Sequence, residues 1–156
     1  MAQHEFPKPG PEHAFLKEGE GTWDAIAKSQ GKESKGLLEV KMVNNGLWML
    51  EVYKGEAAGM PFEGRGATSY DPVSKKYVNV WIDSLMTRPM VSEGTYDKDK
   101  KVLTLRGDMP MPDGKAMKTT YTITYKDANT KVLSLKGAMD GKEFEMVEIT
   151  YKRRTK

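Results

Sequence analysis

From Thr22 onward, apolar and polar residues alternate with a period of two, and this alternation limits what the chain can fold into. Residues 77–83 place apolar and polar side chains on two faces in turn, and residues 119–125 do the same. β-branched and aromatic residues dominate both segments, as expected on pleated, half-buried surfaces. The pattern predicts an all-β body.

Turn-forming residues separate the alternating segments at short intervals. Asn-Gly and Asp-Gly pairs supply the positive φ angles that tight hairpins require. The turn signals are Asn45-Gly46, Asp71-Pro72, residues 97–100, Asp113-Gly114, residues 127–129 and Asp140-Gly141. Links of hairpin length predict an antiparallel meander, in which strands adjacent in sequence are adjacent in space.

A meander of this length must curl, and an up-and-down barrel removes the open edges of a flat sheet. Glycines inside strands favour strong curvature, and a two-sheet sandwich is the competing fold. The glycines concerned are Gly64, Gly66, Gly94 and Gly107. We expect about nine or ten strands, near residues 22–30, 34–44, 47–56, 61–70, 76–83, 87–96, 101–109, 115–126, 130–138 and 142–152.

The residues before the first strand divide into an arm and a short helix. Residues 1–10 contain Pro7, Pro9 and Gly10 and are typical of an N-terminal arm. Residues 11–18 predict a helix, because Pro is tolerated in a first turn and Gly19 can end the helix. A length of 156 residues fits one domain, so we expect the arm to be followed by a single barrel domain over 11–156.

One hairpin has a predictable register. If residues 71–76 form the loop, Tyr70 lies opposite Tyr77, and Gly66 and Gly64 lie opposite Trp81 and Asp83. A bulky indole over a strand glycine fills the volume of the missing side chain. Trp81 and Asp83 are therefore expected on one face with the two glycines.

The chain lacks the residues of several common chemistries. It has no Cys, which excludes disulfides, thiolate nucleophiles and Cys-ligated metals. Its two His are His4 and His13, so the barrel body has no imidazole to act as a general base or metal ligand. We expect no cofactor, no metal and no catalytic triad.

The net charge and the lengths of the apolar runs limit the kinds of partner that the protein can be expected to bind. The net charge is +3 with both signs interleaved, and the only basic run is the short tail 152–156, so no nucleic-acid partner is expected. No apolar run approaches the roughly 20 residues needed to span a bilayer. We expect a soluble protein, cytoplasmic or exported. A mature N-terminus after a removed signal peptide is compatible with the start Met1-Ala2-Gln3.

The triplet Gly21-Thr22-Trp23 resembles the Gly-x-Trp motif that opens the first strand of lipocalins and related calycin barrels. The resemblance implies that Trp23 closes the barrel base and packs against a basic residue near the last strand, here Arg153 or Arg154. Haem-binding barrels of the nitrobindin type share this motif but ligate iron through a His near their C-terminal strands. No His follows His13, so that function is not implied.

Longer stretches resemble an uncharacterised bacterial family, domain of unknown function 1579. They cover most of the chain from Gly21 to Tyr151, in order. The matching stretches are residues 59–64, 70–72, 77–78, 81–84, 91–97 and 148–151. The family has no assigned activity, so the resemblance supports a lipocalin-like barrel without indicating its chemistry.

Polar residues within or beside these stretches are the first candidates for a site. A carboxylate on an apolar inner face is unfavourable unless it is paired or near water. The candidates are Glu51, Tyr53, Glu63, Asp83, Ser84, Glu93 and Glu148. Arg65, Arg88 and Arg106 could instead neutralise the acids; Glu93 and Arg106 are close to cross-strand diagonal neighbours. Asp83 is the preferred residue, because it shares a face with Trp81 and precedes the turn 84–88.

Methionine is frequent, with 11 residues. Flexible thioethers can line an adaptable apolar pocket, fill an ordinary core or bind Cu(I), and all three interpretations stay open. The residues near strand ends or in connecting segments include Met60, Met86, Met90, Met109, Met111 and Met117.

Together these features favour non-covalent binding of a small, mostly apolar molecule inside the barrel. The expected contact residues are Tyr53, Phe62, Trp81 and Met86, with Asp83, Arg88 and Glu93 orienting a polar group. One alternative is a cofactor-independent isomerase or cyclase that uses an inward carboxylate. A raised pKa without an Arg partner would favour this enzyme. Another alternative is a homo-oligomeric module, such as a homodimer through the outer face of 77–83.

Overall fold

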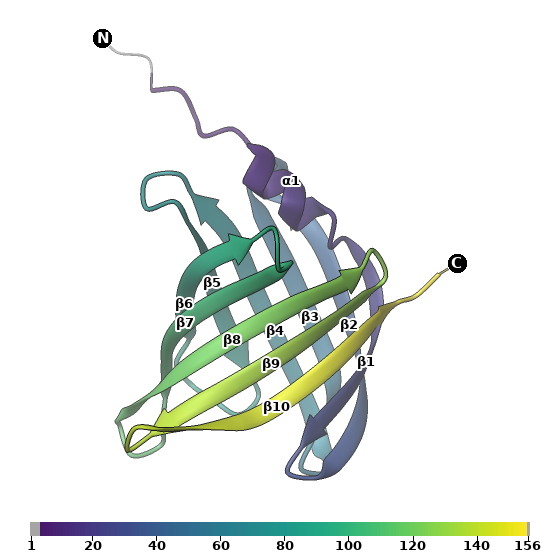
Figure 1. Cartoon of the computed structure of the whole chain (residues 1–156), viewed down its shortest axis with the longest axis vertical. Coiled ribbons are helices and arrows are strands. Elements are labelled where there is room, and N and C mark those ends of the chain that lie inside the picture. Colours follow the sequence, from purple (N-terminus) through teal and green to yellow (C-terminus); the bar gives the residue numbers. More distant parts are fainter. Residues whose placement is uncertain (1–3, 156) are drawn as a thin grey trace.

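The computed structural model describes residues 4–155 and forms a closed antiparallel barrel with one short helix (Figure 1). Each strand pairs with its neighbours in sequence, and β1 pairs with β10. The elements are α1 (Pro11–Lys17), β1 (Gly21–Ser29), β2 (Lys32–Val43), the 3-10 turn η1 (Asn44–Gly46), β3 (Trp48–Ala57), β4 (Met60–Asp71), β5 (Lys76–Asp83), β6 (Met90–Asp97), β7 (Val102–Pro110), β8 (Ala116–Asp127), β9 (Thr130–Met139) and β10 (Lys142–Arg153).

The predicted all-β, up-and-down barrel is confirmed, with ten strands. Closure depends on an antiparallel ladder that joins the two ends of the strand series, in which Trp23 lies opposite Arg153 and Lys28 opposite Glu148. Because the ladder completes a ring, the sandwich alternative is excluded and no strand of the barrel is left as an edge.

Two-residue hairpins join several strands through left-handed backbone conformations. Asp140 and Gly141 have φ angles of 51° and 75°, as the Asp-Gly signal predicts. Gln30-Gly31 and Ala58-Gly59 adopt the same conformation, with φ of 50° and 73° in the first pair and 51° and 78° in the second. These two turns are absent from the turn signals above, because Gln and Ala are not residues that favour a left-handed conformation.

The predicted register of the β4–β5 hairpin is confirmed, with Tyr70 opposite Tyr77 and Gly66 opposite Trp81. A Cβ on Gly64 would collide with the Trp81 ring, so the indole occupies the space that this glycine leaves. Gly36 has the same relation to the Tyr53 hydroxyl on the neighbouring strand.

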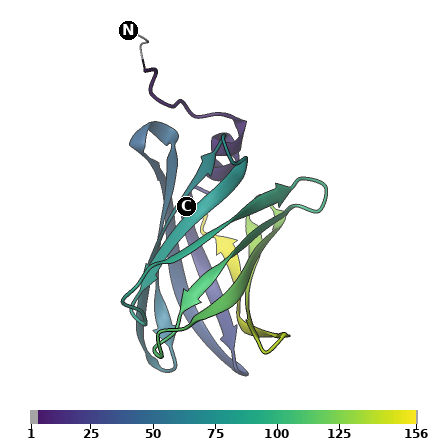
Figure 2. The same cartoon turned by 90° about the vertical axis from the view of Figure 1, so that its left-hand side faces the viewer.

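Helix α1 lies across one end of the barrel in both views (Figures 1 and 2). The helix ends at Lys17, one residue earlier than predicted, and Glu18 is its C-cap. Phe15 points from the helix into a group of tyrosine rings and stacks on Tyr96 with ring centroids 4.1 Å apart. The helix is thereby attached to the barrel end by aromatic packing.

Trp23 and Arg153 pack against each other at this end of the barrel and bind the segment that connects α1 to β1. The Trp23 Nε1 donates to the Gly19 carbonyl at 3.0 Å, and the Arg153 guanidinium lies 4.2 Å from the centre of the indole. Arg153 also donates to the Glu18 and Glu20 carbonyls. Of the two expected partners of Trp23, Arg153 packs against it, while Arg154 pairs with Asp24 on the surface.

Candidate functional site

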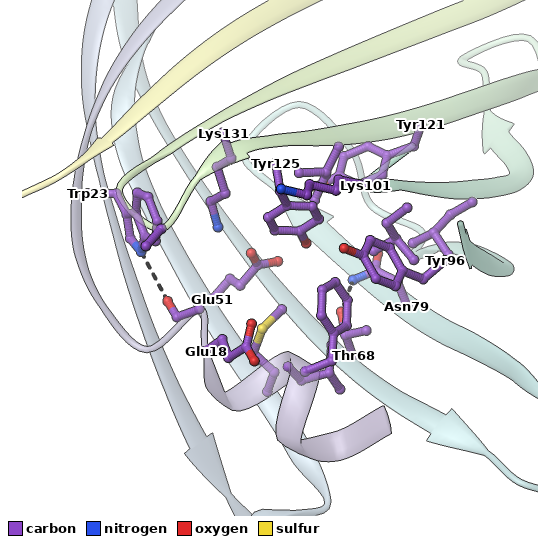
Figure 3. A pocket seen from close by; sticks show the side chains of 18 of the residues that line it. Glu18, Trp23, Glu51, Thr68, Asn79, Tyr96, Lys101, Tyr121, Tyr125 and Lys131 are labelled. Carbon is purple, nitrogen blue, oxygen red and sulfur yellow. Dashed lines mark hydrogen bonds between the residues drawn. The ribbon is translucent and has the colours of Figure 1, made fainter. Parts of the chain in front are cut away.

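A cavity of about 510 Å³ lies inside the barrel at the end covered by α1 (Figure 3). Phe15 and Leu16 of the helix contribute to its wall, and the remaining lining comes from the strands and from the connecting segments at the same end. Its aromatic and aliphatic lining includes Tyr96, Leu103, Leu105, Tyr121, Ile123 and Tyr125. An apolar wall of this kind suits a small organic molecule.

The alternation of the strands determines which side chains reach the cavity. Met49 and Glu51 are two residues apart on β3 and therefore share the inner face. On β9 the inward residues begin with Lys131 and continue with Leu133. Two ionisable groups therefore enter the interior at defined positions of two strands.

Glu51 is buried on the inner face, with 7% of its surface exposed. Gly66 lies opposite it on β4, and one Glu51 carboxylate oxygen is 3.1 Å from where a Cβ of Gly66 would be. Within residues 4–155, neither a hydrogen bond nor an ion pair engages this carboxylate. Burial raises the pKa of Glu51, and the charge of Lys131 offsets part of that rise.

Lys131 is buried as well, with 4% of its surface exposed. Its Nζ lies 4.5 Å from the centre of the Trp23 ring and 5.5 Å from that of Tyr151. Burial lowers the pKa of Lys131, Glu51 counteracts that change, and Arg153 adds to it. Figure 3 shows the amine of Lys131 and the carboxylate of Glu51 pointing into the same space from different strands.

Neutral polar groups complete the lining. Asn79 Nδ2 donates to Thr68 Oγ1 at 2.8 Å, so these two side chains satisfy each other next to the cavity. Burial raises the pKa of Tyr121 and Tyr125, and the nearby charge of Glu51 raises both further. The tyrosine hydroxyls therefore stay protonated and can donate hydrogen bonds to a guest.

The aromatic residues predicted for the site lie beyond this cavity, towards the other barrel end. Tyr53 follows Glu51 by two residues on β3, and Trp81 follows Asn79 by two on β5. Tyr53 is part of the buried core and packs against Phe62 with ring centroids 5.9 Å apart. Phe62 and Trp81 are partly buried and pack against this core. The Tyr53 hydroxyl is buried without a hydrogen-bond partner among the described residues.

Three other predicted residues gather at the opposite rim. Asp83, Met86 and Arg88 line an open hollow together with Glu63 and Arg65. The Asp83 carboxylate accepts from Trp81 Nε1 and from the Leu85 amide, both at 2.8 Å. Asp83 thus stabilises the β5–β6 turn, and it does not line the cavity under α1.

Glu93 lies on the outer face of β6, where Lys76 binds its carboxylate at 2.6 Å. Arg106 is its direct register partner rather than the expected diagonal neighbour. Glu63 pairs with Arg65 at 2.5 Å, which confirms the neutralising role considered for that arginine. The structure therefore separates Glu93 from the inward residues.

The six methionines named above also lie away from the cavity. Met90 and Met117 are buried in the core, Met60 is exposed, and Met86 lines the open hollow. The methionine that does line the cavity is Met49. No group of three His, Cys, Asp or Glu side chains able to hold a metal occurs in the part of the chain that the structure describes.

Lys131 was not among the sequence candidates. The sequence pattern that indicates its inward position is the alternation along β9, which places Lys131, Leu133 and Leu135 on one face and Ser134 on the other. A lysine in phase with apolar residues indicates an inward position. The preceding turn at residues 127–129 made a solvent-exposed lysine at the strand start the simpler interpretation.

The outer face considered for a homodimer is partly apolar. Val80 and Val91 are register partners on β5 and β6, and Ile82 and Val91 are 51% and 52% exposed. A homodimer through this face stays a prediction. None of the helices in residues 4–155 has the length and apolar character needed to cross a membrane.

The structure is a closed antiparallel barrel, and the solved structures that resemble it are barrels as well. The family described as "Protein of unknown function (DUF1579)" matches residues 8–153. The chain belongs to this family, as its resemblance predicted. None of the curated proteins compared with the chain matches its sequence.

Solved structures show the same fold at low identity. The S-type phycobiliprotein lyase CPES from Guillardia theta is 10% identical, with a TM-score of 0.59 over 93% of each chain. A de novo designed fluorescence-activating β-barrel is 20% identical, with a TM-score of 0.50 over 89% of this chain and 96% of its own. Both likenesses concern the barrel fold.

Proposed function

We propose that the protein binds one small, mostly apolar molecule in the cavity beneath α1. The observation that carries this proposal is the internal space of about 510 Å³ with an aromatic and aliphatic lining. Ligand pockets for small molecules commonly have volumes of roughly 300–1,000 Å³. The fold likeness to a fluorescence-activating barrel and a lyase is compatible with binding of a small molecule, but the proposal rests on the cavity.

The polar residues give the guest an orientation. Tyr96, Tyr121 and Tyr125 offer ring faces and hydroxyl donors, while Glu51 and Lys131 present an acceptor and a donor to the same space. Each of the two ionisable groups loses hydration on burial, so a guest that hydrogen-bonds to either of them recovers part of that loss. The preferred guest has an apolar body and one polar group.

The first experiment tests whether the cavity is used. The protein as isolated is examined by native mass spectrometry for a copurified molecule and then titrated with 1-anilinonaphthalene-8-sulfonate, with tryptophan fluorescence as the readout. We expect one dye per chain. Leu105→Trp fills the cavity and should abolish dye binding, whereas Val91→Trp on the outer face should leave it unchanged.

Circular dichroism verifies that both variants fold. Equal dye affinity in a folded Leu105→Trp variant and in the Val91→Trp control would contradict binding in this cavity. Absence of both a copurified molecule and dye binding in the wild-type protein would also overturn the proposal.

Glu51 favours a second candidate function, a cofactor-independent enzyme that moves a proton. Its pKa is raised by burial, and no arginine pairs with it among residues 4–155. A carboxylate with a raised pKa is better matched to proton abstraction near neutral pH. The probe is 2-tetralone in deuterated buffer, followed by proton NMR. Exchange next to the carbonyl that is lost in Glu51→Gln supports this function, and exchange equal in both proteins contradicts it.

A further inference from the structure

Two lysines line the cavity, and their surroundings differ. Lys101 lies on the β6–β7 turn and is exposed, while Lys131 points inward from the start of β9. Lys131 is paired in register with Tyr151 on β10 and with Tyr125 on β8. Its amine is therefore surrounded by aromatic groups and faces an internal space large enough for a small molecule.

Burial disfavours the protonated form of Lys131, and the charge of Arg153 adds to this effect, whereas the charge of Glu51 counteracts it. Arg153 lies on the same indole, with its guanidinium carbon 4.2 Å from the ring centre, compared with 4.5 Å for Lys131 Nζ. Glu51 faces the amine from β3 without an ion-pair contact. Burial together with the neighbouring cation lowers the pKa of Lys131. Desolvation and a second cation are the two conditions that make a lysine amine nucleophilic in proteins.

We propose that Lys131 is a covalent attachment site, at which a small apolar aldehyde held in the cavity forms a Schiff base with the ε-amine. This inference rests on the proposed function, since it assumes that the cavity admits a guest. It adds the chemical class of that guest, an aldehyde on an apolar body, and the residue that captures it.

The bond changes are those of imine formation. The neutral amine attacks the carbonyl carbon, the C–N bond forms, and the carbonyl π electrons move to oxygen, which takes up a proton while nitrogen loses one. The resulting carbinolamine then loses hydroxide with a proton, as water, and the C=N bond forms. One amine and one aldehyde thus give one imine and one water, with no change in oxidation state.

Glu51 is placed to assist the second step. Its carboxyl lines the same cavity, and because burial raises its pKa, it retains a proton at higher pH than an ordinary carboxylic acid. The protonated carboxyl can donate to the departing hydroxyl group. The rings of Trp23 and Tyr151 then flank the attached guest, as they flank the amine.

The experiment traps the imine by reduction. The full chain is incubated with limiting 6-methoxy-2-naphthaldehyde and sodium cyanoborohydride at neutral pH, and the secondary amine is located by peptide mass mapping. A lowered pKa gives Lys131 a larger fraction of neutral amine, and the cavity holds the aldehyde beside it, so we expect the adduct at Lys131 to exceed that at every other lysine. Lys131→Arg should abolish this adduct, and Lys142→Arg, at an exposed lysine at the start of β10 that does not line the cavity, is the control that should retain it.

A second probe separates this inference from the proposed function. The corresponding alcohol, 6-methoxy-2-naphthalenemethanol, has the same body and cannot form an imine. If the alcohol binds but the aldehyde labels only surface lysines, the attachment site is wrong and the binding function stands. If neither probe enters the cavity, both proposals are overturned. Should Lys131→Arg fail to fold, the adduct map of the wild-type protein still decides.

Discussion

Single residues define the chemistry of this barrel. Glu51 and Lys131 each lose hydration on burial, and they share one cavity without forming an ion pair. Such an arrangement contributes less to stability than a well-packed apolar pair would, because burial penalises both charged forms. Under the proposed function, hydrogen bonds from a guest to these two groups would offset part of this cost.

The raised pKa of Glu51 predicts a specific pH dependence of stability. Below its ordinary value of 4.5 the carboxyl is protonated in both states. As the pH rises above that value, the unfolded chain loses the proton first, and the folded state becomes less stable until the pH passes the higher pKa of the folded state. Glu51→Gln removes this loss, so its stability relative to wild type should increase by about 1.4 kcal/mol for each pH unit within that interval.

Urea denaturation between pH 4 and pH 8 measures this difference. Glu39→Gln is the control, because Glu39 lies exposed on the outer face of β2. The control should follow the wild-type pH profile. A Glu51→Gln variant that tracks the wild type across the whole range would show that the carboxyl has no raised pKa in the folded protein.

At the scale of elements, the turns determine how the strands register. The Ala58-Gly59 turn places an alanine at a φ of 51°, where a Cβ is unfavourable. The turn forms because the flanking strands β3 and β4 pair over nine residue positions, from Met49–Thr68 to Ala57–Met60. Strand pairing thus overrides a local preference at this turn.

Ala58→Asn is expected to stabilise the protein, because Asn tolerates the left-handed conformation better than Ala does. The free energy of unfolding should rise by about 0.5–1 kcal/mol, measured by urea denaturation. Ala57→Asn is the matched control, since Ala57 is extended and half-buried in β3 and should gain nothing. Equal effects at both positions would mean that backbone strain at Ala58 is not relieved.

The elements were largely predictable from the sequence, whereas the site was not. Alternation and turn residues specify strands and even the β4–β5 register, because both depend on neighbouring residues.

Which end of the barrel is hollow depends on side chains from many strands. Tyr53 and Trp81 fill the space left by Gly36 and Gly64, so the interior is packed there, while the end under α1 stays open. Glu51 was among the polar candidates, but Lys131, which faces the same cavity, lies 80 residues further along the chain.

At the scale of the whole molecule, α1 forms the cover of the cavity. Phe15 is half-buried, lines the cavity and packs against Tyr77, Tyr96 and Tyr125. Under the proposed function, a guest that enters or leaves at this end has to displace the helix or pass beside it. We therefore expect the packing of the Phe15 ring to limit how quickly a guest exchanges.

Phe15→Ala should increase the dissociation rate of 1-anilinonaphthalene-8-sulfonate from the cavity. An aromatic pair contributes about 0.5–1.5 kcal/mol beyond its buried area, which corresponds to roughly a two- to tenfold change in rate. Stopped-flow fluorescence measures this rate. Ala14→Ser, on the exposed side of the same helix, is the control and should match the wild type. An unchanged rate in Phe15→Ala would show that the helix does not limit exchange.

The ladder between β1 and β10 also sets an order of events during biosynthesis. Ribosomes release a chain from its N-terminus at roughly 5–20 residues per second, so β1 emerges long before its partner. Until Lys142–Arg153 has been translated, β1 and the most recently completed strand both expose unpaired backbone groups. A nascent chain stalled before Lys142 would display two unpaired edges, and completion of the twelve residues of β10 removes both at once.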